Sequence, residues 1–206
     1  MIGLLDYGLG NISAFENIYK RLNIKTLRVD CRSKVDKAAG LILPGVGSFD
    51  WAMTAFRESG LIDSVCRAVQ VRKTPVLGVC VGMQMMAPES EEGRLAGLGW
   101  IPGKVKKFSS PNSSSAFPLP HMGWNSVQPV PAAKLFSGIA DPKFYFLHSY
   151  HFCPEDPKHA VGKTEYGGEF VSAIRDEHIW ATQFHPEKSH NYGAALLKNF
   201  AEECMC

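Results

Sequence analysis

The stretch that decides the fold is Pro75-Val-Leu-Gly-Val-Cys80-Val-Gly-Met-Gln-Met-Met86. An apolar run of strand length ends at Cys80, which has a glycine two residues away on either side. This pattern is typical of a nucleophile elbow, in which a buried strand turns sharply into a helix and exposes the central side chain. The glycines let the backbone pass where a Cβ atom would clash. We therefore expect a strand, a tight turn and a helix here, with Cys80 at the tip.

The thiol of Cys80 has two interpretations. A thiol at a helix N-terminus lies at the positive end of the helix dipole, which favours the nucleophilic thiolate. A lone cysteine among valines and leucines is also commonly a buried structural residue. The elbow favours the nucleophile, and a suitable base elsewhere in the chain would decide between the two.

Such a base lies far downstream, in Ala181-Thr-Gln-Phe-His185-Pro-Glu187-Lys-Ser189. A thiol nucleophile needs a base, and an imidazole base needs a third group that fixes its tautomer. Pro186 biases His185 toward extended backbone, in which residues two apart share a face, so Glu187 can reach the ring. A histidine taken alone is more often a locally satisfied residue. Its pairing with an elbow cysteine predicts a catalytic triad of Cys80, His185 and Glu187.

The size and composition fit one globular domain over residues 1–206. Hydrophobic residues make up 45% of the chain, charged residues 20%, and the formal net charge is +2. These values exclude a disordered chain, and no basic cluster points to nucleic acid. The apolar segments are shorter than the roughly 20 residues that span a bilayer. The chain begins directly with a strand pattern and carries no secretory signal, so we expect a cytoplasmic protein.

The cysteines and histidines do not form a disulfide or metal pattern. The six cysteines are scattered along the chain, and no C-x-x-C pair occurs. His148 and His151 are three apart in an expected strand, which would place them on opposite faces. A zinc site needs ligands that converge. We therefore expect reduced thiols, no bound metal and no cofactor.

Strands and helices alternate in the first half of the chain. We expect strands at 2–7, 25–30, 40–44 and 75–79, and helices at 12–22, 50–58, 61–71 and from 81 onward. Such alternation favours a parallel sheet covered by helices on both faces. Active groups in these sheets collect at the carboxyl ends of the strands, and Cys80 lies at one of them.

From about residue 101 onward, one strand pattern follows another. We expect strands at 104–108, 124–130, 143–152, 160–166, 170–175 and 179–184, a polar surface loop at 109–115, and a final helix around 192–200. These strands are joined by turns and favour antiparallel pairing. The expected fold class is therefore α/β with three layers: a mostly parallel central sheet, helices on both faces and a more antiparallel C-terminal half.

A second glycine-containing segment, Leu43-Pro-Gly45-Val-Gly47, follows a strand and precedes a helix. Its backbone N–H groups could stabilise an oxyanion together with the N–H of Val81, although Pro-Gly also marks ordinary turns. Gln84 and Glu92 could bind a zwitterionic substrate, or they could be a helix-surface amide and part of a solvated acidic run. The residues alone leave both alternatives open.

Five motifs occur in order over nearly the whole chain. They are Leu43-Pro-Gly-Val-Gly47, Gly78-Val-Cys-Val-Gly-Met-Gln84, Pro120-His-Met-Gly-Trp-Asn125, Phe144-Tyr-Phe-Leu-His-Ser149 and Gln183-Phe-His-Pro-Glu-Lys-Ser189. The set resembles the class I (triad) glutamine amidotransferases. Within that class, the third and fifth motifs resemble the glutaminase subunits of imidazole glycerol phosphate synthase, the HisH subfamily.

The resemblance implies hydrolysis of L-glutamine to glutamate and ammonia through a thioester on Cys80. His185 would transfer the protons and Glu187 would orient it. The family binds its substrate at positions that correspond to Gly47, Val81, Gln84, Glu92 and Ser149. It contacts a (β/α)8-barrel cyclase of the HisF type, as a heterodimer, at positions that correspond to Asn11, Met122, Trp124, Asn125, Tyr145 and Lys188.

The resemblance leaves three alternatives open. Related paralogues supply ammonia for sugar amidination in surface-polysaccharide synthesis, a catalytically silent subunit could keep the fold and bind a synthase, and a cysteine hydrolase could act on another amide. The complete triad argues against a silent subunit. Val81 stands where the family commonly has leucine. Ala87-Pro88 interrupts the helix after the elbow earlier than in the family, and such an early end would shift Glu92 relative to the site.

Overall fold

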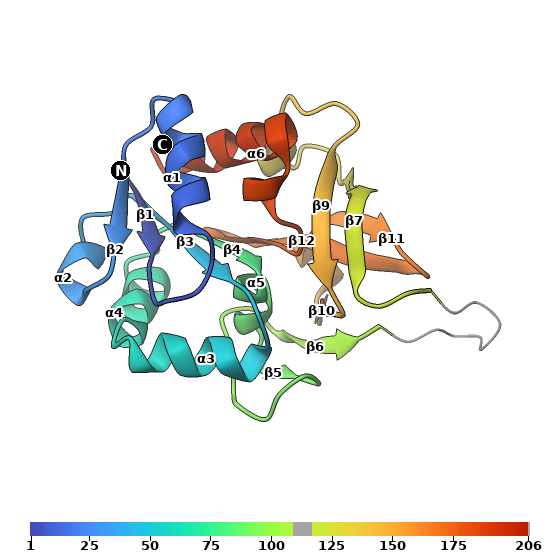
Figure 1. Ribbon diagram of the computed structural model, residues 1–206, viewed down its shortest axis with the longest axis horizontal. Coiled ribbons are helices and arrows are strands. Elements are labelled where there is room, and N and C mark those ends of the chain that lie inside the picture. Colours follow the sequence, from blue (N-terminus) through green and yellow to red (C-terminus); the bar gives the residue numbers. More distant parts are fainter. Residues whose placement is uncertain (109–116, 206) are drawn as a thin grey trace.

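A computed structural model describes residues 1–108 and 117–205 (Figure 1). Its centre is an eight-stranded sheet in the order β2-β1-β3-β4-β13-β12-β11-β8. These strands are β1 (Ile2–Leu5), β2 (Thr26–Val29), β3 (Gly40–Gly45), β4 (Val76–Cys80), β8 (Gln128–Pro129), β11 (Ala160–Glu165), β12 (Glu169–Asp176) and β13 (Ile179–Thr182).

The two halves of this sheet differ in strand direction. β2, β1, β3, β4 and β13 are parallel to one another, whereas β12, β11 and β8 are joined by antiparallel pairing. Parallel neighbours need long crossover connections, and the helices of the first half supply them. The pairing of β13 with β4 joins the two halves and brings the C-terminal motif beside the elbow. The expected sheet architecture is confirmed.

Helices cover both faces of the sheet, as expected. Figure 1 shows α1 and α6 on one side and α3, α4 and α5 on the other. The helices are α1 (Ile12–Arg21), α2 (Arg32–Val35), α3 (Phe49–Glu58), α4 (Ile62–Cys66), its π-helical continuation η1 (Arg67–Val71), α5 (Val81–Met85) and α6 (His190–Glu203), with short 3-10 turns η2 (Lys134–Phe136), η3 (Pro157–His159) and η4 (Pro186–Lys188). None of the helices within the described residues has the length and apolar character needed to cross a bilayer.

The helices bury apolar stripes at helical spacing against the sheet. In α1, Phe15, Ile18 and Tyr19 are buried and belong to the same apolar core as the fully buried strand residues Leu4 and Ile42. Because both faces of the inner parallel strands are covered, β1, β3 and β4 are buried along their whole lengths and do not alternate between apolar and polar residues. The rigid core therefore fixes the strand ends on which the candidate site lies.

Two smaller sheets flank the antiparallel half. β7 (His121–Ser126) pairs with β9 (Lys143–His148), and β10 (Tyr150–Pro154) pairs with β6 (Gly103–Lys107), which also pairs with β5 (Glu89–Ser90). The single strands expected at 124–130 and 143–152 are therefore wrong, because each is two strands in different sheets. Apolar and aromatic residues continue across the bend at Ser149, so the strand pattern does not reveal it.

The bend at Ser149 also changes the positions of two histidines. The rings of His148 and His151 both contact Phe108, with centroids 5.2 and 4.7 Å from its ring, so the expectation of opposite faces is wrong. Within residues 1–108 and 117–205, no cluster of three potential ligand side chains could hold a metal ion. The loop expected at 109–115 lies outside the described residues.

Candidate active site

The elbow forms where β4 ends and α5 begins. Cys80 adopts φ 56° and ψ −113°, a left-handed backbone conformation that strains a residue with a side chain. The neighbouring glycines are required by contact: a Cβ on Gly82 would overlap the carbonyl oxygen of Leu43, and one on Gly78 would crowd Met86 and the Gly82 backbone. The predicted strand, turn and helix are confirmed, and the tight packing holds the cysteine at the tip.

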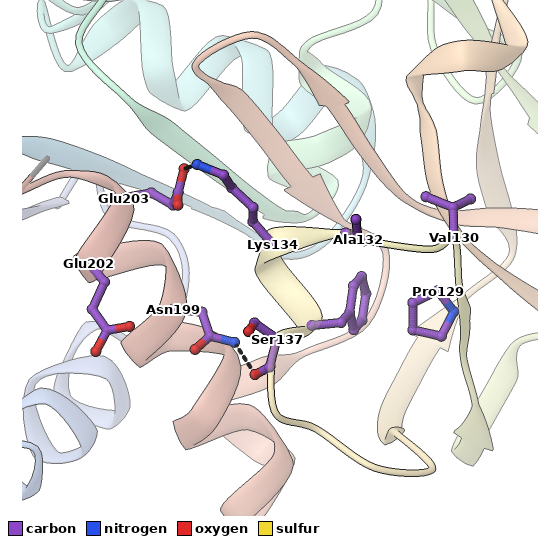
Figure 2. A pocket seen from close by; sticks show the side chains of 10 residues that line it. Pro129, Val130, Ala132, Lys134, Ser137, Asn199, Glu202 and Glu203 are labelled. Atoms are coloured by element: carbon purple, nitrogen blue, oxygen red, sulfur yellow. Dashed lines mark hydrogen bonds and ion pairs between the residues drawn. The ribbon is translucent and has the colours of Figure 1, made fainter.

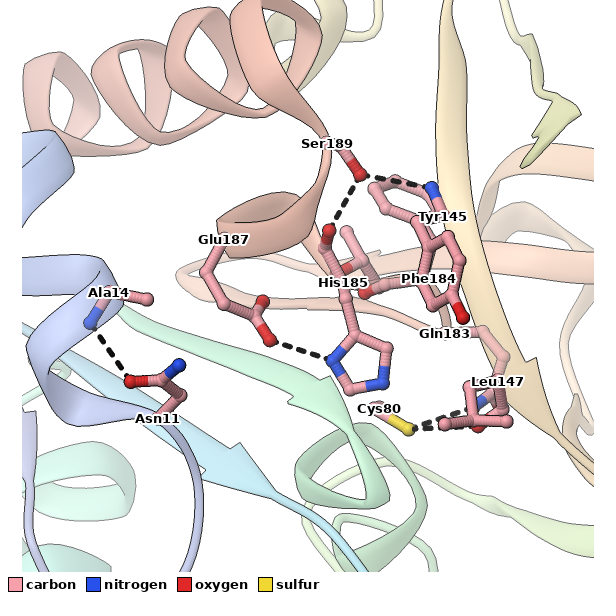
Figure 3. A network of polar contacts seen from close by, with 11 residues as sticks. Asn11, Ala14, Cys80, Tyr145, Leu147, Gln183, Phe184, His185, Glu187 and Ser189 are labelled. Carbon is pink, nitrogen blue, oxygen red and sulfur yellow. Dashed lines mark hydrogen bonds and ion pairs between the residues drawn. The ribbon is translucent and has the colours of Figure 1, made fainter. Parts of the chain in front are cut away.

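His185 reaches this tip because β13 runs parallel to β4, with Thr182 beside Val79. The chain continues past β13, and the His185 N–H donates to the Tyr145 carbonyl at 2.8 Å. Figure 3 shows the imidazole facing Cys80 on one side and Glu187 on the other. The distance from Nδ1 of His185 to Oε1 of Glu187 is 2.8 Å.

The charge on the imidazole is set by its two neighbours. Burial opposes the cation, but the negative charge at Cys80 and the hydrogen bonds with Cys80 and Glu187 outweigh it and raise the pKa of His185 to about 10. These contacts therefore favour the cationic form of the ring. This arrangement favours a thiolate–imidazolium pair, the reactive form of a cysteine–histidine site.

The sulfur has two further polar neighbours. Its thiol form donates to the Leu147 carbonyl at 3.7 Å, and the Gln183 amide donates to the sulfur at 3.9 Å (Figure 3). Gln183 is absent from the set predicted from sequence. Its position two residues before His185 in extended chain was the available signal, since such residues share a face.

Gln84 lies beneath the site and is only 2% exposed. Its amide nitrogen donates to Oε1 of Gln183 at 3.1 Å and to the Tyr150 carbonyl at 3.0 Å. Because Oε1 of Gln183 is engaged in this way, its amide nitrogen is left to face Cys80. Gln84 thus orients a neighbour of the nucleophile, and it does not line the open cavity.

A cavity of about 360 Å³ opens over Cys80. The predicted residues that line it are Gly47, Cys80, Val81, Glu92, Ser149, His185 and Lys188, and the unpredicted ones include Val46, Leu147, His148 and Tyr150. Its volume lies in the range of small-molecule sites. The early end of α5 does not remove Glu92 from the site.

Glu92 is fixed at the cavity wall by a backbone contact. Its Oε2 accepts a hydrogen bond from the N–H of Phe49 at 2.9 Å. Burial raises the pKa of the Glu92 carboxyl, and this hydrogen bond acts in the opposite direction. In its ionised form, which the Phe49 hydrogen bond favours, the Glu92 carboxylate can bind a cationic group in the cavity.

Two residues outside the predicted set hold the site together. Ser189 donates from its hydroxyl to the His185 carbonyl at 2.6 Å and accepts from the Tyr145 N–H at 2.9 Å. The Tyr7 hydroxyl donates to the Pro44 carbonyl in the glycine-containing loop. Burial first, and then the charge at Cys80, raise the pKa of Tyr7. Ser189 was part of the C-terminal motif, and Tyr7 lies just past the carboxyl end of β1.

Most residues expected at a partner interface lie around the cavity mouth. Met122 and Trp124 project outward from β7 and are 66% and 48% exposed. Tyr145 pairs with Trp124 across the sheet, and Nζ of Lys188 lies 5.8 Å from the Tyr145 ring centre. Leu147, which was not predicted, adds to this exposed face.

The two asparagines expected at the interface are placed differently. Asn125 lies on the opposite face of β7 and donates to the Glu165 carbonyl at 2.9 Å. Asn11 is exposed, and its side chain accepts from the Ala14 N–H at 3.1 Å as the N-cap of α1 (Figure 3). Neither belongs to the face formed by Met122 and Trp124.

A second cavity of about 350 Å³ lies between α6 and residues 129–137 (Figure 2). Four of its lining residues form two polar contacts with one another. Lys134 pairs with Glu203 at 2.9 Å, and the Asn199 amide donates to the Ser137 carbonyl at 2.9 Å. It contains no cysteine or histidine, so the chemistry concentrates at Cys80.

This chain is similar over nearly its whole length to known proteins. The family model described as glutamine amidotransferase class-I matches residues 4–204. A Bdellovibrio bacteriovorus protein named imidazole glycerol phosphate synthase subunit HisH is 48% identical over 98% of this chain and 100% of its own length. A Leptospira interrogans protein of the same name is also 48% identical, over 98% of this chain and 99% of its own length.

Two solved structures share the fold. One, titled as a glutamine amidotransferase, has a TM-score of 0.73 at 20% identity and covers 100% of this chain and 99% of its own. PurLQS from Thermotoga maritima has a TM-score of 0.73 at 16% identity and covers 98% of this chain and 97% of its own. At these identities the likeness concerns the fold alone.

Proposed function

Because this chain belongs to the class-I glutamine amidotransferase family, we propose that it is a glutaminase that converts L-glutamine to glutamate and ammonia through a thioester on Cys80. Residues 1–206 form a single domain for this activity. The observation that carries the proposal is the convergence of Cys80, His185 and Glu187 at one end of the parallel sheet. The similarity of both relatives over their full lengths supports it.

The first half of the reaction follows from the charge state of the site. The Cys80 thiolate attacks the side-chain amide carbon of glutamine, and the carbonyl oxygen becomes an oxyanion. The N–H of Val81, at the start of α5, and those of the 45–47 segment are the candidate donors to that oxygen. The His185 imidazolium then gives its proton to the leaving nitrogen, and ammonia departs from a γ-glutamyl thioester.

In the second half, His185 acts as a base. It accepts a proton from water, which attacks the thioester carbon, and glutamate leaves as the sulfur is released. Glu187 holds the ring through Nδ1 and stabilises its cation in both halves. The carboxyl group of Glu92 binds the substrate ammonium, while Gly47 and Ser149 shape the pocket wall.

We propose that the exposed face beside the cavity docks a (β/α)8-barrel cyclase of the HisF type. The two relatives are named as subunits of imidazole glycerol phosphate synthase. Met122, Trp124, Tyr145 and Lys188 form the contact. The heterodimer passes ammonia across this interface to make imidazole glycerol phosphate and AICAR in histidine biosynthesis, in the cytoplasm. Neutral ammonia escapes readily into water, so a closed interface improves its delivery.

The test is reconstitution with a HisF-type cyclase from the same organism, using glutamine labelled with ¹⁵N in its amide. The proposal predicts labelled imidazole glycerol phosphate and glutamate release that the cyclase substrate stimulates. If reconstitution with a different synthase instead transferred the ¹⁵N to a sugar, the chain would belong to the sugar-amidinating branch. Cyclase binding without glutamate release would identify a silent subunit.

A further inference from the structure

A chain of buried polar side chains runs from the cavity wall into the small β7–β9 sheet. His148 lines the cavity, and its Nε2 lies 3.0 Å from Nδ1 of His121 on the neighbouring strand. The Nε2 of His121 lies 3.2 Å from the amide nitrogen of Asn125. The two histidines are directly paired in the strand register and are almost completely buried.

The hydrogen bonds determine a single pair of tautomers. Nδ1 of His148 lies 2.8 Å from the Tyr150 carbonyl, which can only accept, so Nδ1 carries the proton. Nε2 of His148 is then the acceptor, and Nδ1 of His121 is its donor. Nε2 of His121 is in turn the acceptor for the Asn125 amide.

The other contacts of the Asn125 side chain determine which of its two amide atoms is the nitrogen and which is the oxygen. Its nitrogen also donates to the Glu165 carbonyl at 2.9 Å, and its oxygen accepts from the Ser126 N–H at 2.8 Å. A flipped amide would lose both contacts. In the His148–His121–Asn125 series, every donor meets an acceptor only when both rings are neutral and protonated on Nδ1.

Aromatic packing keeps both rings neutral. His121 stacks between Phe146 and Tyr166, with ring centroids 4.6 and 3.9 Å away. Burial lowers the pKa of His121 to about 4 and, with further effects from neighbouring histidines, that of His148 to about 3. Both rings are therefore neutral and only weakly basic at neutral pH.

This series of hydrogen bonds ends at residues 147–150, which shape the pocket. The Tyr150 carbonyl receives hydrogen bonds from both His148 and Gln84, and Gln84 orients Gln183 beside the nucleophile. Ser149 lies between His148 and Tyr150 and lines the cavity. On the other side of His148, the Leu147 carbonyl oxygen lies 3.7 Å from the sulfur of Cys80. Fixing the ring of His148 thus fixes the bend at 147–150 against the site.

We infer that His148 and His121 are positioning residues, which hold the 147–150 bend in its glutamine-binding geometry through the His148–His121–Asn125 chain. This inference rests on the proposed function. It assigns a role in substrate binding to two histidines that do not touch the reacting atoms and lie outside the triad.

The tautomers can be tested on the isolated chain by two-dimensional long-range ¹H–¹⁵N NMR of the histidine rings at neutral pH. The inference predicts Nδ1–H tautomers for both His121 and His148, assigned through single His→Gln variants. An Nε2–H tautomer or a protonated ring at either position would overturn it. This measurement does not depend on a partner or on catalysis.

Substrate binding can be tested in the non-hydrolysing Cys80→Ala background by calorimetry with L-glutamine. Asn125→Asp replaces the donor to His121 by an acceptor and is nearly isosteric, so it breaks the chain with little change in shape. It should weaken glutamine binding about tenfold, as expected for one lost positioning hydrogen bond. His148→Asn, which keeps a donor toward Tyr150, should lose less affinity than His148→Gln, which keeps only an acceptor toward His121.

The control is His151→Gln, because His151 stacks on the same Phe108 ring that His148 contacts but takes no part in the His148–His121–Asn125 hydrogen bonds. It should bind glutamine with unchanged affinity, and thermal unfolding should show all variants folded. Equal affinities of Asn125→Asp and its parent would refute the positioning role. If the Cys80→Ala parent binds no glutamine, the proposed substrate fails, and the NMR result still decides the inference.

Discussion

The Nδ1 atom of His185 and the Oε1 atom of Glu187 are 2.8 Å apart, and the two side chains are only 3% and 4% exposed. His185 has extended backbone at φ −100° and ψ 94°, and Pro186 then starts the short η4 turn that carries Glu187. An ionised pair in such a dry position is strongly coupled, because little water screens it. The carboxylate can therefore both orient the ring and stabilise its positive charge.

Glu187→Gln tests that coupling. The amide oxygen can still accept from Nδ1, but the negative charge is lost, so we expect kcat for glutamine hydrolysis to fall about 10²–10⁴-fold. Steady-state glutamate release by the reconstituted complex measures the effect. Glu202→Gln removes an exposed carboxylate paired with Lys198 and should leave kcat unchanged. A Glu187→Gln enzyme with normal kcat would show that the carboxylate charge is dispensable.

The protonation of His185 gives a second prediction. Its pKa of about 10 in the folded chain lies above the ordinary value of 6.5. The cation therefore contributes stability that is fully present below about pH 6.5 and is lost as the pH rises through about 10. Ring NMR should show His185 still doubly protonated at pH 8, and Cys80→Ala should lower its pKa. A wild-type ring that titrates near pH 6.5 would contradict the ion pair.

The elbow glycines give a prediction about stability. Gly82→Ala would place a methyl group into the Leu43 carbonyl, and such overpacking should lower the free energy of unfolding by about 1–3 kcal/mol or more. Gly138→Ala is the control, because it has positive φ but open space around it, so only backbone strain of about 1–2 kcal/mol applies. Urea unfolding measures both. A Gly82→Ala loss no larger than that of the control would mean that the elbow is loosely packed.

The docking face can be tested with two matched methionines. Met122 and Met205 are 66% and 64% exposed, but only Met122 lies on the proposed contact face. Met122→Ala should weaken binding of the cyclase several-fold, and Trp124→Ala about tenfold or more, because large apolar side chains dominate interface energetics. Met205→Ala should bind normally in the same titration. Unchanged affinity for both Met122→Ala and Trp124→Ala would place the partner elsewhere.

The sequence predicts the parts of this fold that depend on local signals. The elbow could be recognised because Gly78 and Gly82 are required by backbone contacts next to Cys80. The parallel half could be recognised from the alternation of strands and helices, because parallel strands must be joined by crossover connections such as helices. The spacing of His185 and Glu187 was informative because their hydrogen bond is local.

Features that depend on long-range packing were missed. The bend at Ser149 is surrounded by apolar and aromatic residues, so the strand pattern continues through it. The Gln84–Gln183 hydrogen bond and the contact of Tyr7 with Pro44 join segments that only the folded sheet brings together. Asn125 was expected at the interface from its motif, but strand alternation places it on the inner face of β7.

The most direct test of the central role of Cys80 is acid-quench mass spectrometry of the reconstituted complex with glutamine, alongside the hydrolysis rate of Cys80→Ala. We predict a γ-glutamyl group on the peptide that contains Cys80, and a hydrolysis rate about 10³-fold or more lower in the variant. Cys80→Ala should still bind the cyclase. Undiminished hydrolysis by Cys80→Ala, or acylation of a different residue, would contradict the thioester mechanism.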